Sequence, residues 1–194
     1  VHLYLEGDST TNPNPIGYNA ADCDTLVQRC ANAGLYLIIT IGCNGENGTM
    51  DLAWSQDFWN FYGPRYANDT HVIYEAHNEP VPHTINSWTT ADWDDQVALY
   101  NTIRAVAPDT FILLGSFMGF NGDYRSSADY LAANGVSWSN AGFAHHGYES
   151  KSSIESAISG IQSSTQYPAL LCTEFYPGDT EGQGYNSMYE SHFN

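Results

Sequence analysis

The chain contains very few basic residues. Of its 194 residues only five are Lys or Arg, against 22 Asp or Glu, and the formal net charge is −17 at pH 7. Because such a chain cannot build a basic patch to hold phosphate groups, the composition argues against nucleic acid and anionic membranes as partners. A neutral polymer such as a polysaccharide is compatible with it.

Long apolar runs and cysteines are also scarce. No run approaches the ~20 residues of a membrane helix, and nothing resembles a signal peptide, as expected for a mature or trimmed chain. Cys23 and Cys30 would lie ~10 Å apart along one helix, too far for a bridge, whereas a Cys30–Cys43 disulfide stays open. Without a Cys-x-x-Cys spacing we expect no metal and no other cofactor. The acidic, Lys-poor and Tyr/Asn/Ser-rich composition favours a secreted, extracellular protein.

What the sequence does contain is a regular alternation of strand and helix signals. The expected strands are about 1–5, 35–41, 72–79, 110–117, 142–148 and 168–174, and the expected helices are about 19–33, 52–66, 91–107, 123–134 and 152–163. This order is typical of an α/β protein with a parallel sheet. No linker or repeat divides the chain, so residues 1–194 are expected to form a single domain.

Two of the expected strands end in the same way. The run Val72–Tyr74 leads to Glu79 and Pro80, and an equally apolar run leads to Glu174 and then Pro177. We expect each glutamate at the carboxyl end of its strand, where a parallel barrel opens its active site. A glycosidase needs two such carboxylates, one as proton donor and one as nucleophile. The alternative is that each glutamate flanks a turn or pairs with a cation, although cations are scarce here.

Three segments together resemble a known family. Residues 74–80 read Tyr-Glu-Ala-His-Asn-Glu-Pro, residues 143–148 read Phe-Ala-His-His-Gly-Tyr, and residues 172–175 read Cys-Thr-Glu-Phe. In this order they resemble glycoside hydrolase family 5, the cellulase-like family of clan A. The resemblance implies a (β/α)8 TIM barrel in which Glu79 is the acid/base and Glu174 the nucleophile.

The resemblance also implies roles for neighbouring residues. Asn78 would bind the sugar hydroxyl at C2, and Tyr148 would hold the carboxylate of Glu174. His146 would brace the same network, with a packed core histidine as its alternative. For a retaining enzyme we expect the two carboxyls ~5–5.5 Å apart, with the acid/base pKa raised by the neighbouring negative charge.

Aromatic residues near the two strand ends are candidates for sugar binding, because sugars stack on aromatic faces. Trp88 and Tyr176 lie just beyond the two glutamates, with simple loop packing as the alternative for Trp88. Four more aromatic residues recur at helical spacing, and we expect them in the core rather than in a sugar platform. These four are Trp54, Phe58, Phe61 and Tyr62.

The chain departs from the family in its length. A complete barrel takes ~250 residues, and only about six strands are recognisable here, corresponding to strands 2 through 7. The first strand, residues 1–6, lacks the Arg that the family carries near its second strand, and no Trp follows residue 138. We therefore expect a small or incomplete TIM barrel, and favour a trimmed chain over an unusually small, open barrel.

These observations predict a retaining endo-β-glycosidase that hydrolyses β-1,4-glucan, with a polysaccharide or oligosaccharide as its partner. β-Mannan and β-1,3-glucan stay open as substrates, and a different family of the same clan would have the same chemistry. A carbohydrate-binding barrel remnant without activity also stays open, because strands and an Arg are missing although both glutamates are present.

Overall fold

The computed structural model describes residues 1–7, 14–42, 50–81, 88–116, 124–147, 151–166 and 168–175. Strands and helices alternate throughout this part of the chain. In order, the elements are β1 (His2–Gly7), α1 (Ala20–Ala33), β2 (Leu37–Gly42), α2 (Leu52–Tyr62), β3 (Val72–Glu75), α3 (Thr90–Val106), β4 (Phe111–Leu114), α4 (Tyr124–Ala133), the short 3₁₀ helix η3 (Trp138–Asn140), β5 (Ala141–Gly147), α5 (Lys151–Ser163) and β6 (Ala169–Phe175). None of the described helices combines the length and the apolar character that crossing a membrane requires.

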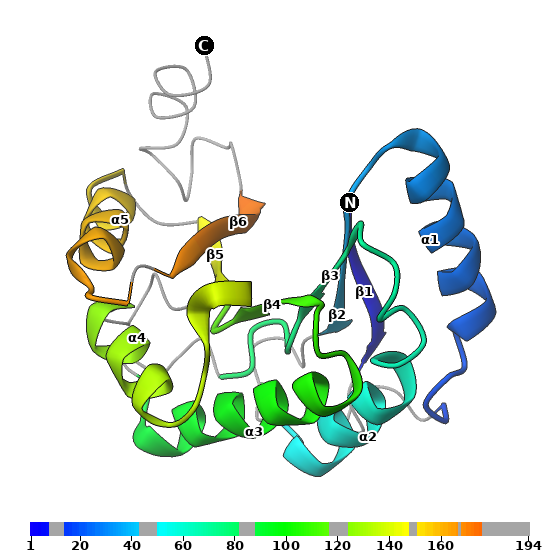
Figure 1. Cartoon of the computed structure of the whole chain (residues 1–194), viewed down its shortest axis with the longest axis horizontal. Helices are drawn as coiled ribbons and strands as arrows, with labels where there is room; N and C mark the ends of the chain where they lie inside the picture. Colours follow the sequence, from blue (N-terminus) through cyan, green and yellow to red (C-terminus); the bar gives the residue numbers. More distant parts are fainter. Residues whose placement is uncertain are drawn as a thin grey trace.

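The six strands form one parallel sheet in the order β1-β2-β3-β4-β5-β6, so each strand pairs with the next strand along the chain. The helices follow one another in an arc around the strands, as Figure 1 shows from α1 on the right through α2 and α3 below to α4 and α5 on the left. β1 and β6 are opposite edges of the sheet, yet His2 Nδ1 lies 4.0 Å from Glu174 Oε1. The sheet is therefore curled into a half-barrel, and the predicted incomplete barrel of six parallel strands is confirmed.

The core lies between the strands and the surrounding helices. Phe58, Trp59 and Tyr62 on α2 have no exposed surface, and Trp59 packs against Tyr74 of β3 at a ring distance of 4.8 Å. The predicted core role is thus confirmed for Phe58 and Tyr62, and Trp54 is partly buried against the same core. It is wrong for Phe61, which is 41% exposed, because it points away from the sheet.

Most element boundaries agree with the sequence to within a few residues, and the exceptions have local causes. α1 ends at Gly34, whose φ of 68° is the left-handed conformation that glycine adopts without strain. Cys23 and Cys30 on this helix are free and buried, so Cys30 does not form the disulfide that the sequence left open. α2 ends at Tyr62 rather than near residue 66, because the turn that follows begins at Gly63.

Strand β3 ends four residues earlier than predicted. The sequence placed Glu79 on the last residue of this strand, whereas β3 stops at Glu75. After it the backbone N–H of Ala76 still donates to Leu113 O of β4, and that of Asn78 donates back to Ile41 O of β2. The chain thus crosses from one neighbour of β3 to the other, which ends the regular ladder before Glu79.

Candidate active site

Glu79, His146 and Glu174 meet at the carboxyl ends of the strands. His146 Nδ1 lies 2.8 Å from Glu79 Oε1 and 3.5 Å from Glu174 Oε2. A ring nitrogen of His146 and one carboxylate oxygen from each glutamate lie within 4.8 Å of one another. The structure therefore brings together the two glutamates and the histidine that the sequence singled out from three distant segments.

Glu79 is held in an unusual backbone conformation. Its φ of 45° is the single positive value among the described residues other than glycine, and strain of this kind gathers at functional sites. The Ser116 hydroxyl, just after β4, fixes this turn: it accepts the Glu79 N–H at 2.8 Å and donates to His77 O at 2.9 Å. The turn directs the Glu79 side chain to His146.

Glu174 and His146 face each other through the pairing of β5 with β6. The register is regular up to His145 and Cys172, and then shifts so that His146 pairs with Glu174. Irregularities of this kind redirect side chains and occur next to active sites. Without the shift, His146 would pair with Thr173 and Glu174 would lie one position further on.

Two residues that the sequence analysis did not predict complete the cluster. Glu75, the last residue of β3, accepts a hydrogen bond from His2 Nε2 at 2.8 Å, and its Oε1 lies 3.8 Å from His146 Nε2. His2 in turn approaches Glu174 to 4.0 Å. A signal for Glu75 was present in the sequence: it is a carboxylate inside an apolar strand, two positions from Ile73 and so on the face opposite Tyr74.

In this cluster, burial and the neighbouring charged groups have opposite effects on the pKa of each carboxylate and of His146. Burial raises the pKa of Glu174, and the nearby His2 partly opposes this. Burial would raise the pKa of Glu75 as well, but the nearby His146 and the hydrogen bond from His2 outweigh it and lower the pKa. Burial would lower the pKa of His146, yet Glu75 and Glu79 outweigh it and raise the pKa. The arrangement therefore favours a charged His146 between carboxylates.

His145, the neighbour of His146 on β5, has a different environment. Its Nδ1 is hydrogen-bonded to the Tyr124 hydroxyl of α4 at 2.7 Å. Burial and then the charge of His146 lower the pKa of His145 to about 4, so it is neutral near pH 7. The two adjacent histidines thus differ in charge because one faces carboxylates and the other a phenol.

The remaining predicted substrate contacts are placed less favourably or lie elsewhere. Asn78 is 1% exposed and His146 has no exposed surface, and His146 faces the two glutamates; a contact of either residue with substrate stays a prediction. Trp88 is 9% exposed, and its ring stacks on that of Trp93 of α3 at 4.3 Å. This contact matches the alternative of simple loop packing, and stacking of a sugar on Trp88 stays a prediction. Tyr148 and Tyr176 lie outside the described residues.

The three donor atoms of Glu79, His146 and Glu174 are close enough to meet a cation. A cation there would compete with the hydrogen bond between His146 and Glu79, and that the site holds no metal stays a prediction. The same atoms suit proton transfer and nucleophilic attack, the chemistry of a carboxylate pair.

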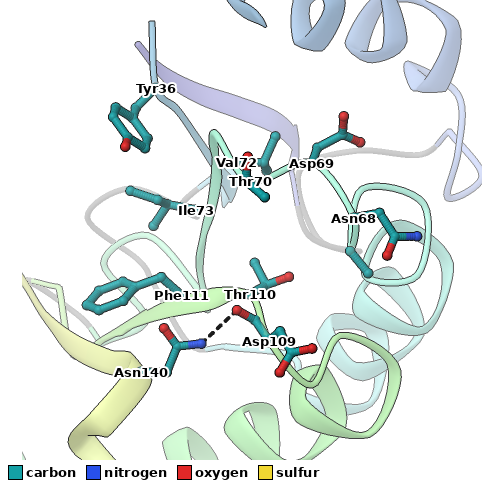
Figure 2. Close-up of a pocket in the computed structure, with 11 residues that line it drawn as sticks. Tyr36, Asn68, Asp69, Thr70, Val72, Ile73, Asp109, Thr110, Phe111 and Asn140 are labelled. Atoms are coloured by element: carbon teal, nitrogen blue, oxygen red, sulfur yellow. Dashed lines mark hydrogen bonds between the residues drawn. The ribbon is translucent and has the colours of Figure 1, made fainter.

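A cavity lies at the opposite end of the sheet. A cavity of about 460 Å³ opens among residues at the amino ends of β2 to β5. Figure 2 shows Tyr36, Ile73 and Phe111 along one side of it, and Asn140 donating to the backbone carbonyl of Asp109 at 2.7 Å. Its lining is mainly apolar and neutral polar, without a pair of buried ionisable groups among the described residues.

Comparison with known proteins identifies relatives of this chain. The family model described as Cellulase (glycosyl hydrolase family 5) matches residues 3–190. Endoglucanase Z of Dickeya dadantii is 25% identical over 173 residues, which cover 88% of this chain and 38% of that protein. The chain therefore spans well under half the length of this curated relative.

Solved structures agree in fold. Cellulase Cel5C_n matches with a TM-score of 0.68 at 23% identity, covering 99% of this chain and 60% of that chain. The catalytic domain of Thermobifida fusca endoglucanase Cel5A matches with a TM-score of 0.63 at 22% identity, covering 90% of this chain and 56% of that chain. At these identities the likeness establishes the fold, and the chain corresponds to about three fifths of each neighbour.

Proposed function

The chain belongs to the cellulase family, glycosyl hydrolase family 5, and from this premise we propose that it is a retaining endo-β-glycosidase that hydrolyses β-1,4-glucan. The observation that carries the proposal is the convergence of Glu79, His146 and Glu174 within 4.8 Å. Retaining enzymes place their carboxyls ~5–5.5 Å apart, whereas inverting enzymes leave ~6.5–9.5 Å for a water molecule. The spacing here supports the retaining class.

In the first step Glu174 attacks the anomeric carbon while Glu79 protonates the departing glycosidic oxygen. Glu174, near the end of β6, is proposed as the nucleophile, and Glu79, whose Oε1 lies 2.8 Å from His146 Nδ1, is proposed as the acid/base. The products are a covalent glycosyl-enzyme at Glu174 and a shortened glucan chain with a free hydroxyl group.

In the second step Glu79, now a carboxylate, removes a proton from water, which attacks the glycosyl-enzyme and releases Glu174. The N–H of His146 donates to Glu79 Oε1, and a positive charge on that imidazole stabilises the carboxylate form. Asn78, next to the acid/base, is proposed to bond the C2 hydroxyl, a contact that strengthens in the transition state.

The substrate is proposed from the relatives. The curated relative is named an endoglucanase, and one solved neighbour is a mannanase from Streptomyces sp. SirexAA-E, with a TM-score of 0.62 at 18% identity. Glucan is therefore our first substrate, and mannan is the second to be tested. A secreted location is proposed with it, on the acidic, Lys-poor composition alone.

The test is hydrolysis of carboxymethyl-cellulose, mannan and laminarin, measured as new reducing ends. Glu174→Gln should abolish activity, and Glu155→Gln, the same substitution at an exposed residue of α5, should leave it unchanged. Proton NMR of the first product should show the β-anomer. A folded chain that hydrolyses none of the three polymers, or a first product of inverted configuration, would overturn the proposal.

A further inference from the structure

We propose that Glu75 is a positioning residue of this site, a buried counter-ion that orients His2 toward Glu174 and holds His146 as a cation against Glu79. His146 then supplies positive charge that Lys or Arg supplies in other sites. This inference rests on the proposed function for its catalytic consequence, although the charge arrangement itself can be tested without a substrate.

The geometry places Glu75 between the two histidines. Its Oε2 lies 2.8 Å from His2 Nε2, and its Oε1 lies 3.8 Å from His146 Nε2. The other nitrogen of each ring faces a catalytic carboxylate: His146 Nδ1 lies 2.8 Å from Glu79 Oε1, and His2 Nδ1 lies 4.0 Å from Glu174 Oε1. Each imidazole thus bridges Glu75 to a residue that takes part in the reaction.

Burial requires that this charge be balanced. The Glu75 side chain is 1% exposed, His146 is fully buried and His2 is 14% exposed. A buried carboxylate is costly unless it is paired and hydrogen-bonded. A cationic His146 balances part of the negative charge of these carboxylates, and the hydrogen bond from His2 pairs the other oxygen of Glu75.

No Lys or Arg is placed to do this instead. Four of the five lie on helices and the fifth follows α2, so none is on a strand of the described sheet. The five are Arg29, Arg65, Arg104, Arg125 and Lys151. The segments of this sequence outside the described residues contain no Lys or Arg either, and the basic side chains beside the described carboxylates of the site are His2 and His146.

The groups facing each imidazole are consistent with this role. His146 faces Glu75 at the end of β3, Glu79 beyond it and Glu174 on β6, with His145 beside it on its own strand. Glu75 and Glu79 raise the pKa of His146 against the opposing effect of burial, and His146 and His2 lower that of Glu75.

Catalysis benefits in two places. Burial raises the pKa of Glu174, and the nearby His2 opposes that rise, which favours the ionised form of the nucleophile. A charged His146 stabilises Glu79 when it becomes a carboxylate after donating its proton. Because Glu75 touches neither the sugar nor the reacting atoms, its removal should affect the rate of the chemical step far more than substrate binding.

The kinetic test is Glu75→Gln, which keeps the shape of the side chain and removes its charge. We expect kcat to fall about 10²-fold with KM changed less than about threefold, and the alkaline limb of the kcat/KM profile to move to lower pH. His2→Gln should lower kcat as well, and His2→Arg, which carries a permanent charge, should retain activity. His71→Gln is the matched control. His71 is also part-buried, but it precedes β3 and its ring bonds the backbone carbonyl of Val27 on α1, away from the glutamates.

The second measurement needs no substrate. Imidazole ¹⁵N chemical shifts report whether the His146 ring is protonated. The ring should stay protonated up to a higher pH in the wild type than in Glu75→Gln. If the wild type is inactive but the His146 titration still differs between wild type and Glu75→Gln, the proposed function is overturned and the charge arrangement stands. An unchanged His146 titration, or a Glu75→Gln variant that raises KM with an unchanged pH profile, would overturn the positioning role. If Glu75→Gln does not fold, the His2 variants decide.

Discussion

The two ends of the half-barrel differ in what they enclose. The amino ends of the strands surround a cavity of about 460 Å³, lined mainly by neutral side chains. The carboxyl ends bring together Glu75, Glu79 and Glu174 with His2 and His146, all at least mostly buried. The functional end is thus marked by converging buried charge rather than by the size of a hollow.

The difference has a physical cause. Charged groups are expensive to bury, so a protein retains a cluster of them where their interactions have a use. The hollow at the amino ends is lined mainly by neutral groups such as Thr110 and Asn140, and its Asp109 is exposed, so it carries little such cost. The carboxyl ends of the strands in barrel enzymes carry the chemistry, and their amino ends contribute to stability.

The largest contrast between the two ends is expected from charge removal. Glu79→Gln should lower kcat on carboxymethyl-cellulose by about 10³-fold or more, because the leaving oxygen loses its proton donor. Asp109→Asn, at the amino ends and exposed, should change kcat less than about twofold, within the range of surface substitutions. Equal losses for the two variants would contradict the assignment of the ends.

A smaller contrast is expected from single hydrogen bonds. Ser116→Ala removes the hydroxyl that fixes the Glu79 turn, and should cost about 1–3 kcal/mol of unfolding free energy together with a fall in kcat. Asn140→Ala removes the bond to Asp109 O at the other end, and should cost about 1 kcal/mol with kcat unchanged. Chemical denaturation beside steady-state kinetics separates the two effects.

The pH dependence of stability should come from the charged end. The pKa of Glu75 is lowered from its ordinary 4.5, so its stabilising contribution is present above that value and lost as pH falls through the folded-state pKa. The pKa of His146 is raised from 6.5, so its contribution is present below 6.5 and lost as pH rises through the folded-state pKa. Unfolding free energy should therefore peak between these values, and the peak should flatten in Glu75→Gln.

The smallest effect is expected from filling the neutral cavity. Val72→Ile adds one methylene group at a buried residue of its lining. Stability should change by less than about 1 kcal/mol in either direction, since the added group gains burial only where the hollow accommodates it. Thermal unfolding and the hydrolysis rate together test this, and a large loss of activity would show that the amino ends take part in function after all.

The sequence was sufficient to predict the alternating elements and the two glutamates at strand ends, because each lies in a local pattern at the end of an apolar run, whereas His146 was predicted from the family resemblance. It was not sufficient for Glu75 and His2. Their partnership depends on the curl of the sheet, which brings the first strand against the last and leaves no pattern along the chain. The end of β3 was misplaced for a similar reason, since Asn78 bonds across to β2.

The contact between His2 and Glu174 also has a consequence for how the protein is made. It joins residue 2 to residue 174, so the whole segment between them must be in place before the two side chains can meet. Contacts this far apart in sequence form slowly, and a chain emerging from the ribosome folds from its amino end. The nascent protein therefore contains Glu79 and both histidines before Glu174, and the cluster is complete only once β6 has been made and has paired with β5.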